Sequence, residues 1–239
     1  MDTPFPIIQK FNYPKFEAIT FPTGGRVYTT PQGDRVPSVT TILGKMLPKD
    51  GILKWREDVG EEEADRIFYE AGRIGTTMHD MLEGYVSNYR SGRPDIPPQS
   101  EEDKEAKYLA DNIRRYALLD LTEVWGIEEA LYYDKIYAGR TDLIGVYKRK
   151  SAIIDYKNAR RLKEPEWIEG YKLQIAAYNM CHRYMFNEDV ETGIILIAIR
   201  QPCKTPIQQV ILKKDELAHY EEKWVELVAQ YYQQEKIPL

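Results

Sequence analysis

The sequence predicts an α/β protein in which helices flank a central mixed sheet, preceded by a region made mostly of helices. Three observations predict this class. Residues 1–120 carry mainly helical patterns after a short strand pair, and residues 121–239 alternate strand and helical patterns. Residues 193–199 form a continuous apolar run, typical of a strand covered on both faces. We therefore expect an N-terminal hairpin and helical region over 1–120, packed on a core over 121–239 as one compact unit.

The N-terminal region is expected to contain strands at 26–30 and 35–36, a helix beginning within 37–43, and helical stretches at 52–90 and 101–119. The two strands flank a turn that is rich in Pro and Gly. Ser38 is a candidate N-cap, because its hydroxyl can accept a hydrogen bond from the first helical turn. A polar, proline-rich break at 91–98 separates the two helical stretches.

The core is expected to contain strands at 124–133, 136–147, 152–157, 193–199 and 207–212, and helices at 164–184 and 215–234. The first three strand segments are rich in β-branched and aromatic residues and are separated by turn signals. The last helix is amphipathic, so we expect it to cover one face of the sheet.

The net charge of the whole chain is negative, which excludes the class of strongly basic nucleic-acid-binding proteins. The charge is not evenly distributed, however. The 239 residues include 33 Lys or Arg and 38 Asp or Glu, a formal net charge of −5. Residues 134–163 nevertheless contain nine basic and three acidic side chains, a local charge of +6. A basic segment within an acidic chain is compatible with binding to nucleic acid.

The sequence predicts no membrane partner and a cytoplasmic location. The longest uncharged apolar run, at 194–199, is far shorter than the roughly 20 residues of a membrane-spanning helix. No secretory signal or transit peptide is visible at the N-terminus. Two cysteines cannot supply a four-cysteine site, so no iron–sulfur cluster is expected.

Two aspartates and a lysine fall on one face of the predicted hairpin at 136–157. With a four-residue turn at 148–151, Asp142 lies directly opposite Lys157, and Asp155 is its diagonal neighbour on the same face. Diagonal neighbours in such a ladder are roughly 7–8 Å apart, so the two carboxylates can share one divalent cation.

A divalent cation explains why these residue types occur together. Two carboxylates directed inward from buried strands are costly unless compensated, and Mg²⁺ or Mn²⁺ prefers hard oxygen ligands. Lys157 adds a positive charge for a phosphoryl group. The alternative is that Asp142 caps a turn and that Asp155 and Lys157 form a solvated pair at a sheet edge. The apolar residues 152–154 predict a central strand, which favours the metal site.

The motifs resemble the PD-(D/E)XK nuclease superfamily, and within it the RecB-like exonuclease branch. The resemblance rests on Gly-Arg-Thr-Asp at 139–142, Asp-Tyr-Lys at 155–157, and Gln174 with Tyr178 one helical turn later. Thr141 replaces the proline of the motif. Residues 75–83 are similar to the helix that supplies a histidine metal ligand in that branch. Residues 37–40 and 51–55 further resemble phage-encoded and mitochondrial genome maintenance exonucleases.

The resemblance implies a PD-(D/E)XK (restriction-endonuclease-like) core and a set of site residues. Those expected to be catalytic are Asp142, Asp155, Lys157 and Gln174, and the expected metal ligands are His79, Asp142, Asp155 and the carbonyl of Tyr156. Glu83, one turn after His79, either orients the imidazole or is simply exposed. Relatives carry a glutamate near Glu128 and Glu129, and these two residues point to opposite faces of the strand, so at most one of them faces the site. Glu128 is the one expected to support it.

The residues expected to bind DNA are Ser38, Thr40, Arg140, Arg160, Arg161 and Tyr178. Ser38 and Thr40 either contact a phosphate or only cap their helix. Tyr178 either stacks on a base or braces Gln174. Basic clusters at 148–150 and 160–163 flank the hairpin and are expected to contact the DNA backbone.

The resemblance implies a metal-dependent DNA exonuclease that acts on DNA ends in phage or bacterial DNA processing. If a phage encodes the chain, the expected location is the cytoplasm of the bacterial host. Single-stranded ends are the expected substrate, and Mg²⁺ or Mn²⁺ the expected cofactor. The leading alternative is a double-strand-specific recombination exonuclease. Two further alternatives are a non-catalytic DNA-binding protein on the same fold and a sequence-specific restriction endonuclease.

Overall fold

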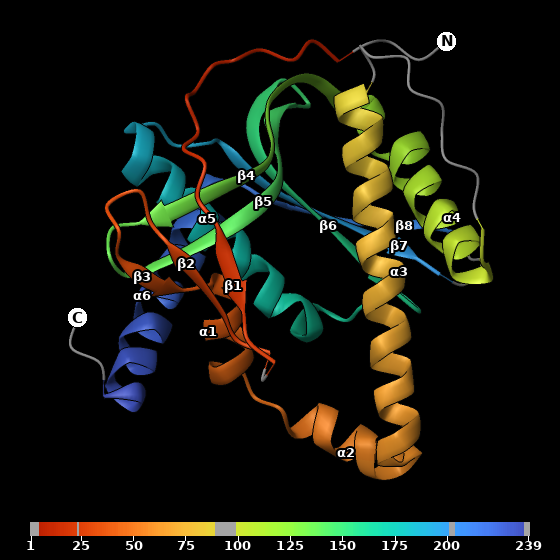
Figure 1. The fold of residues 1–239 in the computed structure, drawn as a ribbon. Coiled ribbons are helices and arrows are strands. Elements are labelled where there is room, and N and C mark those ends of the chain that lie inside the picture. Colours follow the sequence, from red (N-terminus) through yellow and green to blue (C-terminus); the bar gives the residue numbers. More distant parts are fainter. Residues whose placement is uncertain (1–4, 23, 89–98, 201–203, 237–239) are drawn as a thin grey trace.

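A five-stranded mixed sheet forms the centre of the protein, in the order β4-β5-β6-β7-β8 (Figure 1). This computed structural model describes residues 5–22, 24–88, 99–200 and 204–236, so the predicted break at 91–98 lies outside the described residues. The strands are β4 (Leu121–Tyr133), β5 (Tyr137–Tyr147), β6 (Lys150–Ala159), β7 (Thr192–Ile199) and β8 (Ile207–Leu212). Strands β6 and β7 run parallel, and the other neighbouring pairs run antiparallel. The predicted fold class is confirmed.

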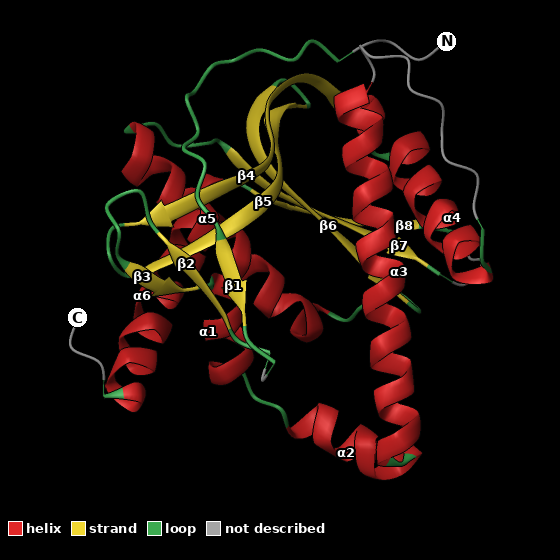
Figure 2. Ribbon diagram, in the orientation of Figure 1, coloured by secondary structure: helices red, strands yellow, loops and turns green. Residues whose placement is uncertain are grey.

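Helices lie on both sides of this sheet (Figure 2). The helices are α1 (Val39–Met46), α5 (Glu169–Phe186) and α6 (Lys214–Glu235) on one face, and α3 (Glu61–Asn88) and α4 (Glu101–Tyr116) on the other, with short 3₁₀ turns at Leu118–Asp120 and Pro165–Ile168. Trp224 of α6 belongs to one apolar core with Ile195 and Ile197, whereas Met78 of α3 belongs to the other with Leu196. Strand β7 is buried along its whole length, as its continuous apolar run predicts.

A second, small antiparallel sheet precedes the helices. It consists of β1 (Ala18–Thr20), β2 (Arg26–Thr29) and β3 (Arg35–Pro37), of which the sequence predicted the last two. Ser38 follows β3 and caps α1, because its hydroxyl accepts a hydrogen bond from the Thr41 N–H at 3.0 Å. Ser38 also bridges to Ala138, which places the start of α1 beside β5.

The helical stretch predicted over 52–90 is two helices. Helix α2 (Asp50–Val59) ends at Gly60, whose φ of +88° is a backbone conformation that favours glycine, and α3 begins directly afterwards. Helix α2 has no buried residue and extends from the lower end of α3 in Figure 1. It therefore projects away from the sheet.

The turn between β5 and β6 is shorter than predicted, and this changes the register of the hairpin. Lys148 and Arg149 alone form the turn, with φ of 49° and 66°, and Tyr147 pairs with Lys150. A two-residue turn with positive φ at both positions matches the right-handed twist of the strands. The predicted pairing of Asp142 with Lys157 is wrong. The last bonded pair is Leu143 with Ile154, and the same register places Asp142 opposite Asp155. The predicted and observed registers differ by two residues, an even number. The side chains of Asp142, Asp155 and Lys157 therefore stay on the same face of the sheet, as predicted.

Strands β5 and β6 diverge at the two aspartates. Their pairing ends at Leu143 and Ile154, whereas β5 continues along β4 to Tyr137 and β6 continues along β7 to Ala159. The sheet therefore opens between its second and third strands, where β5 and β6 run apart in Figure 1. Asp142 and Asp155 stand at the apex of this opening.

The basic cluster at 148–150 lies at the opposite end of the hairpin from Lys157, so the expectation that it lies near the site is wrong. Lys150 and Lys157 are seven residues apart on one strand, or about 23 Å. Lys148 Nζ instead lies 3.3 Å from Asp120 Oδ2. Separately, no helix among the described residues is long and apolar enough to span a membrane.

Candidate active site

Asp142 is the centre of a group of polar side chains contributed by four elements. Its Oδ1 lies 3.3 Å from Nδ1 of His79 on α3, and its Oδ2 accepts a hydrogen bond from the Tyr156 N–H on β6 at 2.5 Å. Burial lowers the pKa of His79, but the hydrogen bond and the charge of Asp142 outweigh it and raise that pKa overall. Asp142 on β5 therefore contacts both α3 and β6 through its carboxylate.

Glu128 lies on the other side of Asp142, on β4. The pairs Ile127–Leu143 and Glu129–Thr141 flank this position, and the Glu128 backbone has a φ of 51°. Ligand atoms of His79, Glu128 and Asp142 all lie within 4.8 Å of one another. Burial, followed by the charge of Asp142, raises the pKa of Glu128 to about 7.

Asp155 is fully buried and makes two polar contacts. Its Oδ2 lies 2.5 Å from Nζ of Lys157, and its Oδ1 accepts a hydrogen bond from Gln174 Nε2 at 3.0 Å. Burial raises the pKa of Asp155, Lys157 opposes that shift, and Asp142 reinforces it. Burial lowers the pKa of Lys157, but Asp155 and Asp142 raise it further than burial lowers it, so the amine stays charged.

Tyr178 braces Gln174, and it lines the same cavity as the rest of the group. The Tyr178 side chain is buried, and its hydroxyl accepts a hydrogen bond from Gln174 Nε2 at 2.9 Å. The ring fits because residue 139 is glycine, where a Cβ would come within 2.4 Å of it. The structure therefore favours the bracing alternative for Tyr178 and places Gln174 against Asp155.

These groups line one cavity of about 530 Å³. Four other residues predicted from the sequence also line it: Ser38, Thr40, Glu83 and Arg140. Ser38 is buried beneath the start of α1, whereas Thr40 and Arg140 are exposed at the cavity. Glu83 is exposed as well, and no hydrogen bond joins it to His79 among the described residues. The structure therefore favours the simple exposed alternative for Glu83.

Arg160 and Arg161 lie outside the lining of this cavity, in the segment that follows β6. The guanidinium of Arg161 lies 5.3 Å from the ring centre of Trp167, and Trp167 is half exposed. Both arginines are exposed, so they are available to a ligand that extends beyond the cavity.

Sequence reasoning missed Arg26 and Asn158, which also line the cavity. Asn158 directly follows Lys157 in the sequence, so its place next to a predicted catalytic residue could have indicated that it lies at the site. Arg26 reaches the cavity only because the small sheet packs beside β5, and no local pattern in the sequence indicates that contact.

The donor set fits a divalent metal ion. His79, Glu128 and Asp142 can converge on one ion. The buried carboxylate of Asp155 lies opposite Asp142 on the neighbouring strand. Oxygen-rich ligand sets suit Mg²⁺ and Mn²⁺, and the single imidazole is a ligand that Mn²⁺ also accepts. The N–H of Tyr156 points to Asp142, and the carbonyl of a strand residue points to the same neighbouring strand as its N–H. The Tyr156 carbonyl therefore faces the same group.

Three curated relatives were found by sequence comparison. The chain is 26% identical over 208 residues to mitochondrial genome maintenance exonuclease 1 of Xenopus tropicalis, which covers 82% of this chain and 57% of that protein. The proteins of the same name from Mus musculus and Homo sapiens are 25% and 22% identical, cover 86% of this chain, and are themselves covered to 61% and 60%. The resemblance to the PD-(D/E)XK exonucleases is confirmed.

The chain spans about three fifths of the length of these relatives. No protein-family model matches it. A crystal structure from Eubacterium rectale is 16% identical, with a TM-score of 0.49 over 69% of this chain and 65% of that one.

Proposed function

We propose that the protein is a metal-dependent DNA exonuclease that hydrolyses phosphodiester bonds from DNA ends. The observation that carries the proposal is the meeting of Asp142 and Asp155 at the point where β5 and β6 diverge, with His79 on one side and Lys157 on the other. The names of the relatives support an exonuclease activity. Phage or bacterial DNA processing in the cytoplasm belongs to the same proposal.

His79, Glu128, Asp142 and Asp155, with the carbonyl of Tyr156, would hold Mg²⁺ or Mn²⁺. When bound, such a cation lowers the pKa of a coordinated water and offsets negative charge on a phosphate. The Tyr156 N–H orients Asp142, and Gln174 orients Asp155, so the protein fixes both carboxylates before DNA arrives.

Lys157 is the chain's own source of positive charge for the phosphate. Its amine is held 2.5 Å from Asp155 and lines the same cavity. As charge accumulates on the phosphate oxygens during attack, a fixed ammonium group stabilises it. Arg140 and Thr40 at the cavity, and Arg160 and Arg161 beyond it, would contact neighbouring phosphates.

A single-stranded DNA substrate is part of this proposal, and the size of the cavity supports it. Its volume of about 530 Å³ is that of a site for a small ligand. A strand end enters such a space one or two nucleotides at a time, whereas a duplex needs a groove on the scale of its own width. A double-strand-specific exonuclease is the competing proposal.

The proposal is tested with oligonucleotides labelled at one end, single- and double-stranded, with blocked ends as controls. We expect Mg²⁺- or Mn²⁺-dependent release of short products from free single-stranded ends. Intact single strands and duplexes under both metals would overturn the enzyme proposal. Internal cuts in circular DNA would indicate an endonuclease, and DNA binding without any cleavage would indicate a non-catalytic protein.

A further inference from the structure

Asn158 presents its side-chain amide to the catalytic cavity from a half-buried position on β6. Its Nδ2 lies beside α3 at Gly75, where a Cβ on residue 75 would come within 2.9 Å of that atom. Gly75 and Asn158 both line the cavity. The absence of a side chain at Gly75 therefore lets α3 pack closely against the amide at the edge of the cavity.

Arg200, at the end of β7, fixes the orientation of this amide. Its Nε and one terminal nitrogen both donate to Asn158 Oδ1, at 3.2 and 3.1 Å. A guanidinium has no acceptor, so the amide cannot be reversed without placing donors against donors. The Oδ1 atom must therefore face Arg200, which turns Nδ2 the other way, toward α3 and the cavity.

Arg200 is itself held in place. Its side chain is only 6% exposed, and its guanidinium nitrogens lie 3.7 Å from Glu70 on α3 and 3.7 Å from Glu105 on α4. Its backbone N–H also donates to the Ala159 carbonyl at 2.8 Å. An arginine held on three sides sets the amide rotamer more rigidly than a surface contact could.

Nδ2 of Asn158 donates to no acceptor in the part of the chain that the structure describes. Its two N–H groups face a cavity that already holds the charged amine of Lys157. Neutral amide donors beside a cationic residue complement the non-bridging oxygens of a phosphate. Successive side chains on a strand point to opposite faces, so Asn158 and Lys157 reach different parts of the cavity.

We propose that Asn158 binds a DNA backbone phosphate next to the one that Lys157 contacts, and that Arg200 is the positioning residue that aims the amide. This inference rests on the proposed function, because it takes DNA as the ligand. A purely structural link between β6, β7 and α3 is the competing explanation for the same hydrogen bonds.

Two substitutions separate these explanations. Asn158→Asp keeps acceptors for Arg200 but removes the donors, and Asn158→Ala removes the donors without adding charge. We expect both to weaken binding of a fluorescent single-stranded oligonucleotide by about 10- to 100-fold in EDTA, the loss expected for a hydrogen bond to a charged group. They should raise KM by the same factor and change kcat much less. The melting temperature of Asn158→Asp should equal or exceed that of the parent.

Gln234→Glu, an exposed amide-to-carboxylate change near the end of α6, is the matched control and should bind like the parent. Arg200→Lys, which loses the fork that fixes Oδ1, should weaken binding while Asn158 is intact. Parent-like affinity and KM in folded Asn158→Ala would overturn the inference, and if that variant does not fold, parent-like values in Asn158→Asp would do so. Absence of both cleavage and DNA binding in the parent would instead overturn the proposed function.

Discussion

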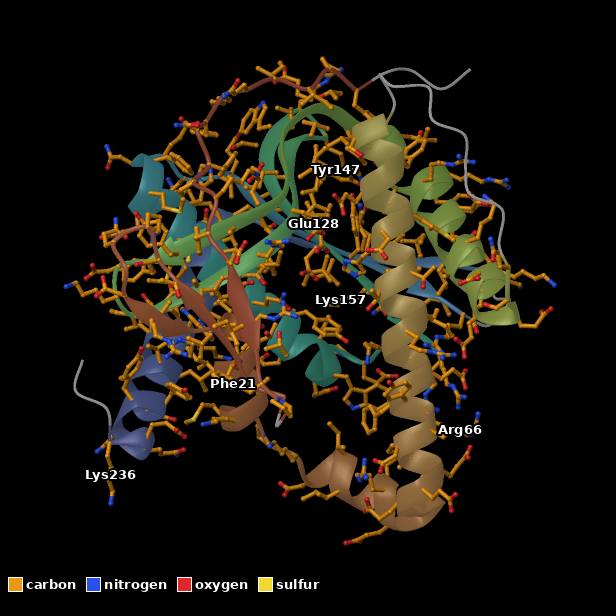
Figure 3. The ribbon with its side chains drawn as sticks, in the orientation of Figure 1. Phe21, Arg66, Glu128, Tyr147, Lys157 and Lys236 are labelled. Atoms are coloured by element: carbon orange, nitrogen blue, oxygen red, sulfur yellow. The ribbon has the colours of Figure 1, made fainter. Side chains whose placement is uncertain are left out.

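Glu128 and Asp142 face each other across β4 and β5 at a point where the Glu128 backbone has a φ of 51°. Ladder pairs lie on both sides of this position, so the ladder resumes after a single irregular residue. A left-handed conformation at a non-glycine residue is costly and persists only where the surroundings enforce it. Here it brings a third acidic side chain to a site that already holds Asp142 and Asp155. Glu128 is labelled in Figure 3.

Glu128→Gln should stabilise the metal-free protein above neutral pH. The pKa of Glu128 rises from 4.5 to about 7 on folding, so the folded state binds the proton more tightly. The stability gained from this tighter proton binding is therefore complete below pH 4.5, and it is lost as the pH rises through 7. At pH 8 we expect a gain of about 1–2 kcal/mol in the unfolding free energy from the variant, allowing for solvent screening.

Urea unfolding in EDTA at pH 5 and pH 8 measures this effect. The variant and the parent should differ much less at pH 5 than at pH 8. An equal difference at both pH values would contradict the assigned shift.

Divalent metal should stabilise the parent protein and not Asp142→Asn. At a concentration of 100 times Kd, a ligand that binds only the folded state contributes about 2.7 kcal/mol. For a chain of this size, that corresponds to a rise in Tm of about 5–10 °C. Thermal melts with MnCl₂ or MgCl₂ measure it, and Glu222→Gln, an exposed acidic residue on α6, is the control that should respond like the parent.

Lys157→Ala should lose cleavage and keep most DNA binding. Removing one fixed charge that stabilises the transition state typically costs about 10²–10³-fold in kcat. Single-turnover cleavage and fluorescence anisotropy on the same oligonucleotide separate the two effects. Equal losses in binding and in cleavage would show that Lys157 acts in binding alone.

Gly139→Ala should disturb the site through Tyr178. The new methyl group would meet the Tyr178 ring at 2.4 Å, and this ring braces Gln174, which contacts Asp155. Overpacking of this kind typically costs about 1–3 kcal/mol, and we expect kcat to fall with it. Gly44→Ala, in α1 with open space around its Cα, should instead be neutral or slightly stabilising.

Lys148→Ala should leave DNA binding and cleavage unchanged, whereas Arg140→Ala should raise KM. Lys148 lies at the hairpin turn, directly after Tyr147. The labelled side chains of Tyr147 and Lys157 lie apart in Figure 3. Arg140 lines the cavity. Steady-state kinetics at two salt concentrations test both variants, and a raised KM in Lys148→Ala would mean that DNA follows another path.

The sequence was sufficient to predict the central sheet and the common face of Asp142, Asp155 and Lys157. That face depends only on the alternation of side chains along each strand, and the alternation survived an error of two residues in register. The register itself was not predictable, because Lys148-Arg149 carries none of the Asn-Gly or Asp-Gly signals of a two-residue turn.

The surroundings of the site depend on packing that no local pattern encodes. The left-handed backbone at Glu128 has no glycine or asparagine to indicate it. The burial of Tyr178 depends on Gly139, a contact between a strand and a helix 39 residues apart in sequence. The bonds from Arg200 to Asn158 join two parallel strands with a helix between them in the chain.

The divergence of β5 from β6 divides the sheet into two plates that are joined along one short seam. One plate is β4 with β5, the other is β6 with β7 and β8, and the seam is the five residue pairs between Tyr147–Lys150 and Leu143–Ile154. Asp142 and Glu128 belong to one plate, whereas Asp155, Lys157 and Asn158 belong to the other. An ion held by Asp142 and Asp155 would therefore cross-link the two parts of the sheet at the point where their backbone pairing ends.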